Sequence, residues 1–176
     1  MYIKCVLTET TMKTKIISLL SEVKRDGIDN LIKFVSESNY LTTARCYSHH
    51  KTAGGLMNHS LEVFDVMMKS NRGRFSRESI ILVALCHDLG KARMHGHKVG
   101  EGDHWQRSVQ ILEMCGVPLT NEEREAILFH HPSGVEQILK AATRPLQMLL
   151  HKGDCVSTWV NKEGRAYVFS TRQPAQ

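Results

Sequence analysis

The stretch IILVALCHDLGK, residues 80–91, restricts the fold more than any other part of the sequence. It opens with an apolar run that suits only a protein interior and then continues directly into His87 and Asp88 before Gly90. Burying an acid and an imidazole at the end of a core helix costs several kcal/mol unless other groups compensate. The compensation must come from other polar groups of the chain that meet this end of the helix.

Apolar residues recur at helical spacing along most of the chain, which predicts an all-α fold. Glycine and proline mark expected helix ends, as at Gly27 and Pro132. Capping-box patterns at Thr120-x-x-Glu123 and Ser133-x-x-Glu136 open two of the later helices, and no alternating run is strong enough for a sheet. The expected helices cover residues 13–25, a short segment capped by Asp29, 56–70, 76–89, 104–115, 120–131, a seventh that begins near 133, and an eighth over 145–161.

The length of 176 residues is that of one domain. We predict a single-domain helical bundle over residues 12–161, an unpatterned N-terminal extension over 1–11 and a C-terminal tail over 162–176. No repeat and no long linker interrupts the helical segments.

Composition narrows the class of protein and its surroundings. The formal net charge of +5 is mildly basic, without the dense Lys/Arg stripes of nucleic-acid-binding proteins, and it suits a small phosphorylated partner. Five scattered cysteines without a C-x-x-C pair predict reduced thiols and a cytoplasmic location. We expect no signal peptide and no membrane partner, because the longest apolar run is too short to span a bilayer.

Imidazole and carboxylate side chains fall on the apolar faces of other predicted helices. His59 and Asp154 each align with leucines one turn away, and His104 leads the apolar face of its own helix. His130 and His131 close the helix that begins near Thr120. Each site alone has an ordinary structural explanation, such as a core histidine bound to a carbonyl or a histidine at a helix C-terminus. One shared metal centre accounts for all of them together, because metal charge offsets the cost of burying carboxylates.

Imidazole and carboxylate ligands without clustered thiols suit Fe, Mn, Zn, Co or Ni. Seven candidate ligands are too many for one ion, so we predict two divalent transition-metal ions that share Asp88, with a single ion as the fallback. The candidate metal ligands are His59, His87, Asp88, His104, His130, His131 and Asp154.

The order of these residues resembles the HD superfamily of metal-dependent phosphohydrolases. The segment GGLMNHSLEVF, which holds His59, looks like that family's first-ligand segment, and ALCHDLGK looks like its defining doublet. The dipeptide His-Asp alone is a weak signal, but the ordered set over about residues 45–160 is specific. The resemblance implies an HD-type helical bundle. It also implies that His59, His87, Asp88 and Asp154 hold one ion, and that Asp88, His104, His130 and His131 hold the other.

Within the superfamily, the extra histidines resemble the subgroup that binds two metals, which includes cyclic-dinucleotide phosphodiesterases and the HD module of a bacterial 3′–5′ exoribonuclease family. Two departures leave the substrate open. The G-Y-P segment of one phosphodiesterase branch is missing, because the chain reads PSGVEQ after His131. We also expect no dedicated nucleic-acid-binding domain like that of the exoribonucleases.

We expect hydrolysis of a phosphate ester, a nucleotide or a phosphodiester, by a metal-activated hydroxide, with Asp88 and Lys91 as catalytic residues. Lys91 lies one turn past the doublet and can meet a phosphate oxygen, as in family members with HDLGK; a solvated lysine is an equal alternative. A basic rim for a polyanionic substrate is expected from two loops, one with Arg45, His49, His50 and Lys51 and the other with His95, His97 and Lys98, although surface charge without a role explains any one of them as well. The predicted substrate-binding residues are Lys91, Arg45, His50, Lys51 and Lys98.

Trp105 is expected in the core, with stacking on a base as the alternative. Two other functions remain open at this point. One is a di-iron oxygenase on the same fold, and the other is a nucleotide sensor that binds without turnover. A homo-oligomer is compatible with the sequence.

Overall fold

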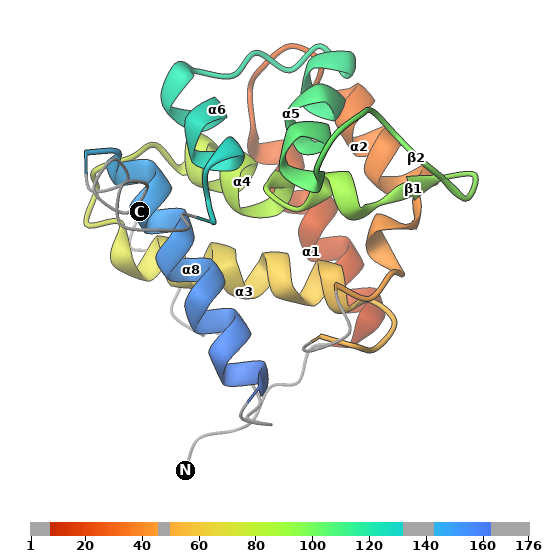
Figure 1. Ribbon diagram of the computed structural model, residues 1–176, viewed down its shortest axis with the longest axis horizontal. Helices are drawn as coiled ribbons and strands as arrows, with labels where there is room; N and C mark the ends of the chain where they lie inside the picture. Colours follow the sequence, from red (N-terminus) through yellow and green to blue (C-terminus); the bar gives the residue numbers. More distant parts are fainter. Residues whose placement is uncertain (1–7, 46–49, 132–142, 163–176) are drawn as a thin grey trace.

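The computed structural model describes residues 8–45, 50–131 and 143–162, and this part of the chain is almost entirely helical (Figure 1). The all-α prediction is therefore confirmed. The helices are α1 (Glu9–Glu22), α2 (Ile28–Glu37), α3 (Gly55–Ser70), α4 (Arg77–Cys86), α5 (His104–Met114), α6 (Asn121–Leu128) and α8 (Pro145–Lys162), with short 3-10 turns η1 (Asn39–Leu41) and η2 (Leu89–Lys91).

Several helix ends differ from the prediction. Helix α1 ends early at Glu22, and α6 ends at Leu128, so His130 and His131 follow α6 instead of closing it. Three other ends differ for local reasons. Helix α1 begins at Glu9, inside the predicted extension, because the Thr8 side chain accepts a hydrogen bond from the Thr11 amide. Helix α2 is preceded by Gly27 with φ 75°, and Asp29 lies in its first turn instead of capping it. Helix α4 ends at Cys86, so the His-Asp doublet lies between this helix and η2.

The loop after Lys91 contains a short hairpin that we did not predict. Strands β1 (Arg93–Met94) and β2 (His97–Lys98) pair antiparallel, with Arg93 opposite Lys98. Two residues a strand are too few to give an alternating pattern in the sequence.

The first predicted capping box is confirmed at the start of α6. The Thr120 side chain accepts from the Glu123 amide at 3.2 Å, and Glu123 Oε2 accepts from the Thr120 amide at 2.9 Å. Arg25 donates to both oxygens of Glu123 at 2.7 Å, which ties α6 to the connection between α1 and α2. The predicted seventh helix lies outside the described residues. Of the predicted tail over 162–176, only Lys162 is described, and it is the last residue of α8.

The core is built around α3 and α4. Residues 80–86 of α4 are at most 1% exposed, which confirms that this apolar run is internal. Helix α3 runs across the middle of the molecule and packs against both α4 and α8, while α6 packs against α8, α5 and α4 (Figure 1). Helix α5 packs against η2. This arrangement brings the end of α4, the start of α5 and the end of α6 together over α3 and α8.

In the described part of the chain, no helix has the length and apolar character needed to cross a membrane.

Candidate metal centre

Asp88 lies at the centre of the site and is fully buried. Its two carboxylate oxygens face different histidines. Oδ1 is 3.1 Å from Nε2 of His104 and 3.8 Å from Nε2 of His130. Oδ2 is 3.5 Å from Nε2 of His87 and 3.9 Å from Nε2 of His59. One carboxylate therefore lies between two groups of imidazoles.

The first of these groups, called the first cluster below, consists of His59, His87, Asp88 and Asp154. Ligand atoms of His59, His87 and Asp88 all lie within 4.8 Å of one another. Asp154 joins them from α8, with its Oδ1 3.1 Å from Nε2 of His59. Helices α3 and α8 and the turn between α4 and η2 each contribute to this cluster, and the inward-facing positions of His59 and Asp154 agree with the sequence prediction.

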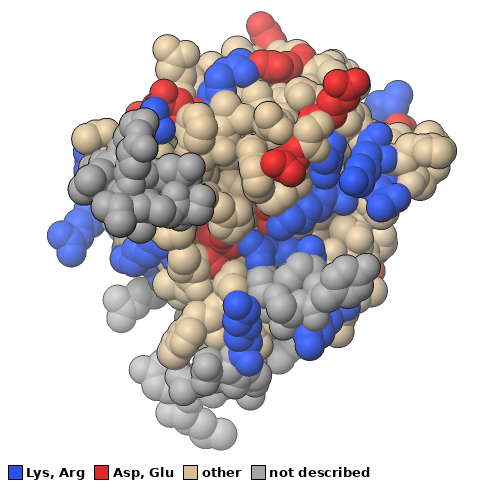
Figure 2. Space-filling model, in the orientation of Figure 1, with Lys and Arg blue, Asp and Glu red and all other residues tan. Residues whose placement is uncertain are grey.

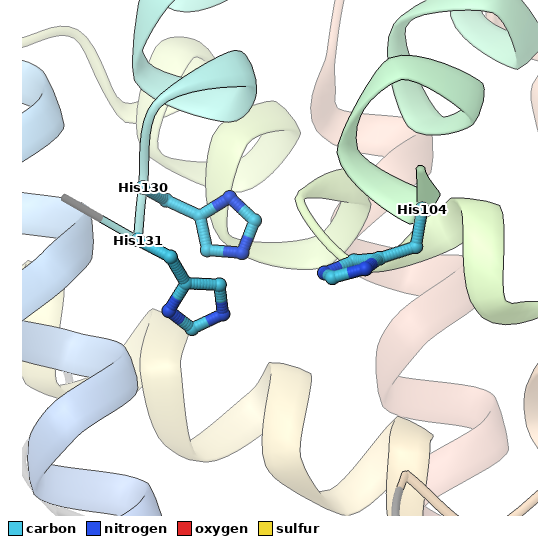
Figure 3. Close-up of side chains that lie close together, drawn as sticks. All are labelled: His104, His130 and His131. Atoms are coloured by element: carbon cyan, nitrogen blue, oxygen red, sulfur yellow. The ribbon is translucent and has the colours of Figure 1, made fainter. Parts of the chain in front are cut away.

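The second cluster consists of His104, His130 and His131, whose ligand atoms also lie within 4.8 Å of one another. His104 comes from the first turn of α5, and His130 and His131 follow α6, so their rings point into one space from opposite sides (Figure 3). His130 is buried, His104 is half-buried and His131 is exposed. His131 also faces the first cluster, with its Nδ1 3.4 Å from Oδ2 of Asp154.

Backbone carbonyls fix the orientation of two of the buried imidazoles. His87 donates from Nδ1 to the Ala84 carbonyl at 2.9 Å, and His130 donates from Nδ1 to the Ile127 carbonyl at 2.7 Å. A neutral imidazole carries only one N–H, so the Nε2 atom of each ring keeps a free electron pair. These electron pairs point toward Asp88, which is the arrangement that metal-binding histidines require.

Charge in the site is arranged as ionised carboxylates among neutral imidazoles. Burial lowers the pKa of His59 well below its usual value, lowers that of His87, and lowers that of His130 to about 3. Burial opposes ionisation of Asp88 and Asp154, but nearby cationic side chains and imidazoles outweigh it, so the pKa of each carboxyl lies well below its usual value. Neutral imidazole and ionised carboxylate are the forms that bind metal.

Three buried polar atoms at this centre make no hydrogen bond. Among the described residues these are Oδ1 of Asp88 and the Nε2 atoms of His104 and His130. Oδ1 of Asp88 and Nε2 of His130 both carry electron pairs, and Nε2 of His104 lies 3.1 Å from that oxygen, although buried polar atoms are normally hydrogen bonded. A divalent cation would satisfy all three together, so the residues present fit a metal centre.

Two cationic side chains of the chain itself contact the buried carboxylates. Arg45 donates from Nε to Oδ2 of Asp88 at 3.0 Å and from Nη2 to Oδ1 of Asp154 at 2.5 Å. Lys91 donates to Oδ2 of Asp88 at 2.6 Å. Both residues were predicted from the sequence to contact substrate, and both lie directly at the first cluster.

The predicted basic rim is only partly present. Arg45 and His50 are buried, so the expectation of an exposed rim is wrong for these two side chains. Lys51 and Lys98 are exposed, and within the described residues no hydrogen bond or ion pair joins either of them to the clusters. His50 instead donates to Glu62 at 2.9 Å, a buried partner that the sequence analysis did not identify.

Trp105 is half-buried rather than part of the core, which corrects the prediction. Its ring lies edge-on to that of His104, with ring centroids 4.7 Å apart. It therefore borders the second cluster.

Helix α5 approaches the His-Asp doublet closely because residue 90 is glycine. A Cβ atom at Gly90 would lie 2.1 Å from the His104 carbonyl oxygen and 2.7 Å from Cβ of Arg107. The Gly90 amide donates to Oγ of Ser108 at 2.8 Å, and Arg107 donates to the Gly90 carbonyl at 3.0 Å. These contacts fix His104 beside Asp88.

The chain belongs to the HD domain family, because the family's model matches residues 56–157, more than half of the 176 residues. The matched segment contains every residue of both clusters. HD domains are typically metal-dependent hydrolases, and the histidine and aspartate clusters are in place to bind a divalent metal. The predicted family is therefore confirmed. Comparisons with curated proteins and with solved structures found no match.

We expect the metal-free protein to lose stability as the pH falls from 7 to 5. Burial keeps His59, His87 and His130 neutral in the folded protein, whereas in the unfolded chain they bind protons below about pH 6.5. His59 and His130, whose pKa values in the folded protein lie well below the usual value, each remove roughly 1.4 kcal/mol of stability per pH unit below about pH 6.5, and His87 acts in the same direction. Asp88 and Asp154, whose pKa values are lowered in the folded protein, reduce its stability only below about pH 4, where the same carboxylates bind protons in the unfolded chain. Urea unfolding with a chelator at pH 7, 6 and 5 tests this; constant stability would contradict it.

Proposed function

We propose that the protein is a metal-dependent phosphohydrolase that hydrolyses a phosphate ester, in the form of a nucleotide or a phosphodiester. The observation that supports this most is the position of Asp88, whose two oxygens face two separate groups of histidines. A carboxylate shared in this way suits a pair of divalent ions, because one anionic ligand can contact both.

In this proposal the first cluster holds one ion, and the second cluster together with Asp88 holds the other. Ions bound there supply water activation and neutralise charge that develops at phosphorus. The chain's own residues keep the imidazoles neutral by burial and keep their Nε2 electron pairs directed inward. Membership of the HD domain family supports metal-dependent hydrolysis as the reaction class.

Cationic side chains on one face of the molecule, and those in contact with Asp88, support an anionic substrate. Figure 2 shows Lys and Arg side chains gathered around the middle of one face, next to acidic side chains. Lys91 is the best candidate for a phosphate contact, because its side chain is 20% exposed while its ammonium touches the central carboxylate. Arg45 is a weaker candidate, because its side chain is only 4% exposed.

The test begins with metal content, measured by elemental analysis on protein purified without chelators or a histidine tag. The loaded protein is then assayed with Mn²⁺, Fe²⁺, Co²⁺, Ni²⁺ or Zn²⁺ on nucleotide monoesters and on phosphodiesters. About two equivalents of metal with release of phosphate or a monoester would support the proposal. Bound iron with oxygen consumption and no hydrolysis would replace it with an oxygenase, and tight nucleotide binding without product would replace it with a sensor.

The replacement Lys91→Met is expected to raise KM for a phosphate ester by roughly 10- to 100-fold, the value of a charge-assisted hydrogen bond, with a smaller change in kcat. The assay uses saturating metal, because Lys91 also touches Asp88. Lys33→Met on the exposed surface of α2 is the matched control and should leave both constants unchanged. An unchanged KM for Lys91→Met would mean that Lys91 does not contact the phosphate and only balances the charge of Asp88.

A further inference from the structure

A line of buried side chains leads from His59 away from the metal ligands. His59 Nδ1 is 2.9 Å from Oγ of Ser157, and that oxygen is 2.5 Å from Oε2 of Glu62. Nε2 of His50 is 2.9 Å from the same carboxylate oxygen. His59 and Ser157 are fully buried, and Glu62 and His50 are each 3% exposed. These four hydrogen-bonded residues connect α3, α8 and the segment before α3.

The direction of each hydrogen bond among these four residues follows from which side-chain atoms can donate and which can accept. A carboxylate can only accept, so Ser157 must give its single hydroxyl hydrogen to Glu62. The Ser157 oxygen is then left to accept from Nδ1–H of His59. A neutral imidazole has only one N–H, so Nε2 of His59 carries an electron pair instead of a proton. That atom faces Asp154 and His87, at 3.1 and 3.2 Å.

Glu62 is itself held on several sides. His50 donates to Oε2 at 2.9 Å, and Asn58 donates from its side chain to Oε1 at 2.9 Å. The His50 amide in turn donates to the Asn161 side chain at 2.6 Å. The carboxylate therefore keeps a fixed orientation toward Ser157.

His59 differs from His87 and His130 in how its tautomer is fixed. Those two histidines donate to main-chain carbonyls, whereas the Nδ1 partner of His59 is a side chain. The opposite tautomer of His59 also has an acceptor ready, because Oδ1 of Asp154 lies 3.1 Å from Nε2. Without Ser157, the proton can move to Nε2, and the ring would then offer no electron pair to the first cluster.

We propose that Ser157 and Glu62 are positioning residues that hold His59 in the Nδ1–H tautomer and keep its Nε2 electron pair directed at the first cluster. The tautomer is a property of the metal-free protein and can be tested by itself. Its consequence for metal binding rests on the proposed function. Outer partners of metal-binding histidines contribute typically ~10- to 100-fold to metal affinity.

The first experiment records long-range proton–nitrogen NMR spectra of the metal-free full chain with ¹⁵N-labelled histidine. Wild-type His59 is expected to show a protonated Nδ1 and an unprotonated Nε2. Ser157→Ala is expected to move the proton to Nε2. Glu62→Gln keeps the shape of the side chain but replaces one acceptor oxygen with a donor, and it is expected to populate both tautomers.

Ser60→Ala is the matched control, because Ser60 is equally buried and adjacent to His59 but gives its hydrogen to the Leu56 carbonyl at 3.1 Å. This variant should keep the wild-type tautomer. A protonated Nε2 in wild-type His59 would overturn the proposal. So would an unchanged Nδ1–H tautomer in both Ser157→Ala and Glu62→Gln.

The second experiment titrates each protein with Zn²⁺ against a chelator of known affinity. Ser157→Ala is expected to weaken one binding step by roughly 10- to 100-fold relative to wild type and to Ser60→Ala. An altered tautomer with unchanged Zn²⁺ affinity would overturn the positioning role at the metal. If wild type binds no Zn²⁺, Mn²⁺ or Fe²⁺ at all, the proposed function fails, while the NMR result still decides the tautomer.

Discussion

Asp88→Asn is expected to remove metal from both clusters and to lower phosphohydrolase activity by at least about a hundredfold, the scale on which one preorganised charged or polar group contributes to catalysis. The reason is that Asp88 contributes an oxygen to each group of histidines, so one replacement weakens both. Asparagine keeps the shape of the side chain and leaves Arg45 paired with Asp154. The helical fold should therefore persist, as measured by circular dichroism.

The control for this replacement is Asp26→Asn, which makes the same chemical change at an exposed position between α1 and α2. It should keep wild-type metal content and activity. Metal stoichiometry by elemental analysis and initial rates on a phosphate ester give the two readouts. An Asp88→Asn protein with two bound ions and full activity would contradict the shared-carboxylate arrangement.

The second large effect is expected from Gly90→Ala. The added methyl group would lie 2.1 Å from the His104 carbonyl oxygen, and a main-chain atom cannot move aside as a flexible side chain can. Overpacking of this kind costs about 1–3 kcal/mol. The first turn of α5 would have to shift, which would move His104 away from Asp88. We expect a lower unfolding temperature together with loss of metal from the second cluster.

Gly73→Ala separates crowding from backbone strain. Gly73 has φ 74° and no atom within 4 Å of an added Cβ, so its replacement carries only the cost of a left-handed residue, about 1–2 kcal/mol. Metal content should stay at the wild-type level in this variant. If Gly90→Ala behaved like Gly73→Ala, with destabilisation but full metal content, the close approach of α5 would not position His104.

Helical periodicity was enough to predict where the candidate ligands point. His59 and Asp154 were placed on inward faces by the apolar residues one turn away, and the structure brings both into the first cluster. The burial of residues 80–86 followed from their composition alone. These features depend on local sequence, because a side chain on the apolar face of a helix must enter the core.

The placement of Arg45 and His50 could not be predicted in the same way. Both belong to an irregular segment without a period, so no pattern indicates which side chains turn inward. Their partners, Asp88 and Glu62, are 43 and 12 residues further along the chain. The role of Glu62 was missed for a related reason. Its position three residues after His59 was visible, but its contact with Ser157 depends on how α8 packs on α3.

The contacts of Arg45 and Lys91 with the two central carboxylates have a consequence for the order of assembly. Two acidic and two basic side chains balance one another there, so the chain carries its own counter-ions. Zinc fingers, by contrast, are unfolded without metal. We expect this domain to fold before it acquires metal, so that the ion can later exchange while the fold stays intact.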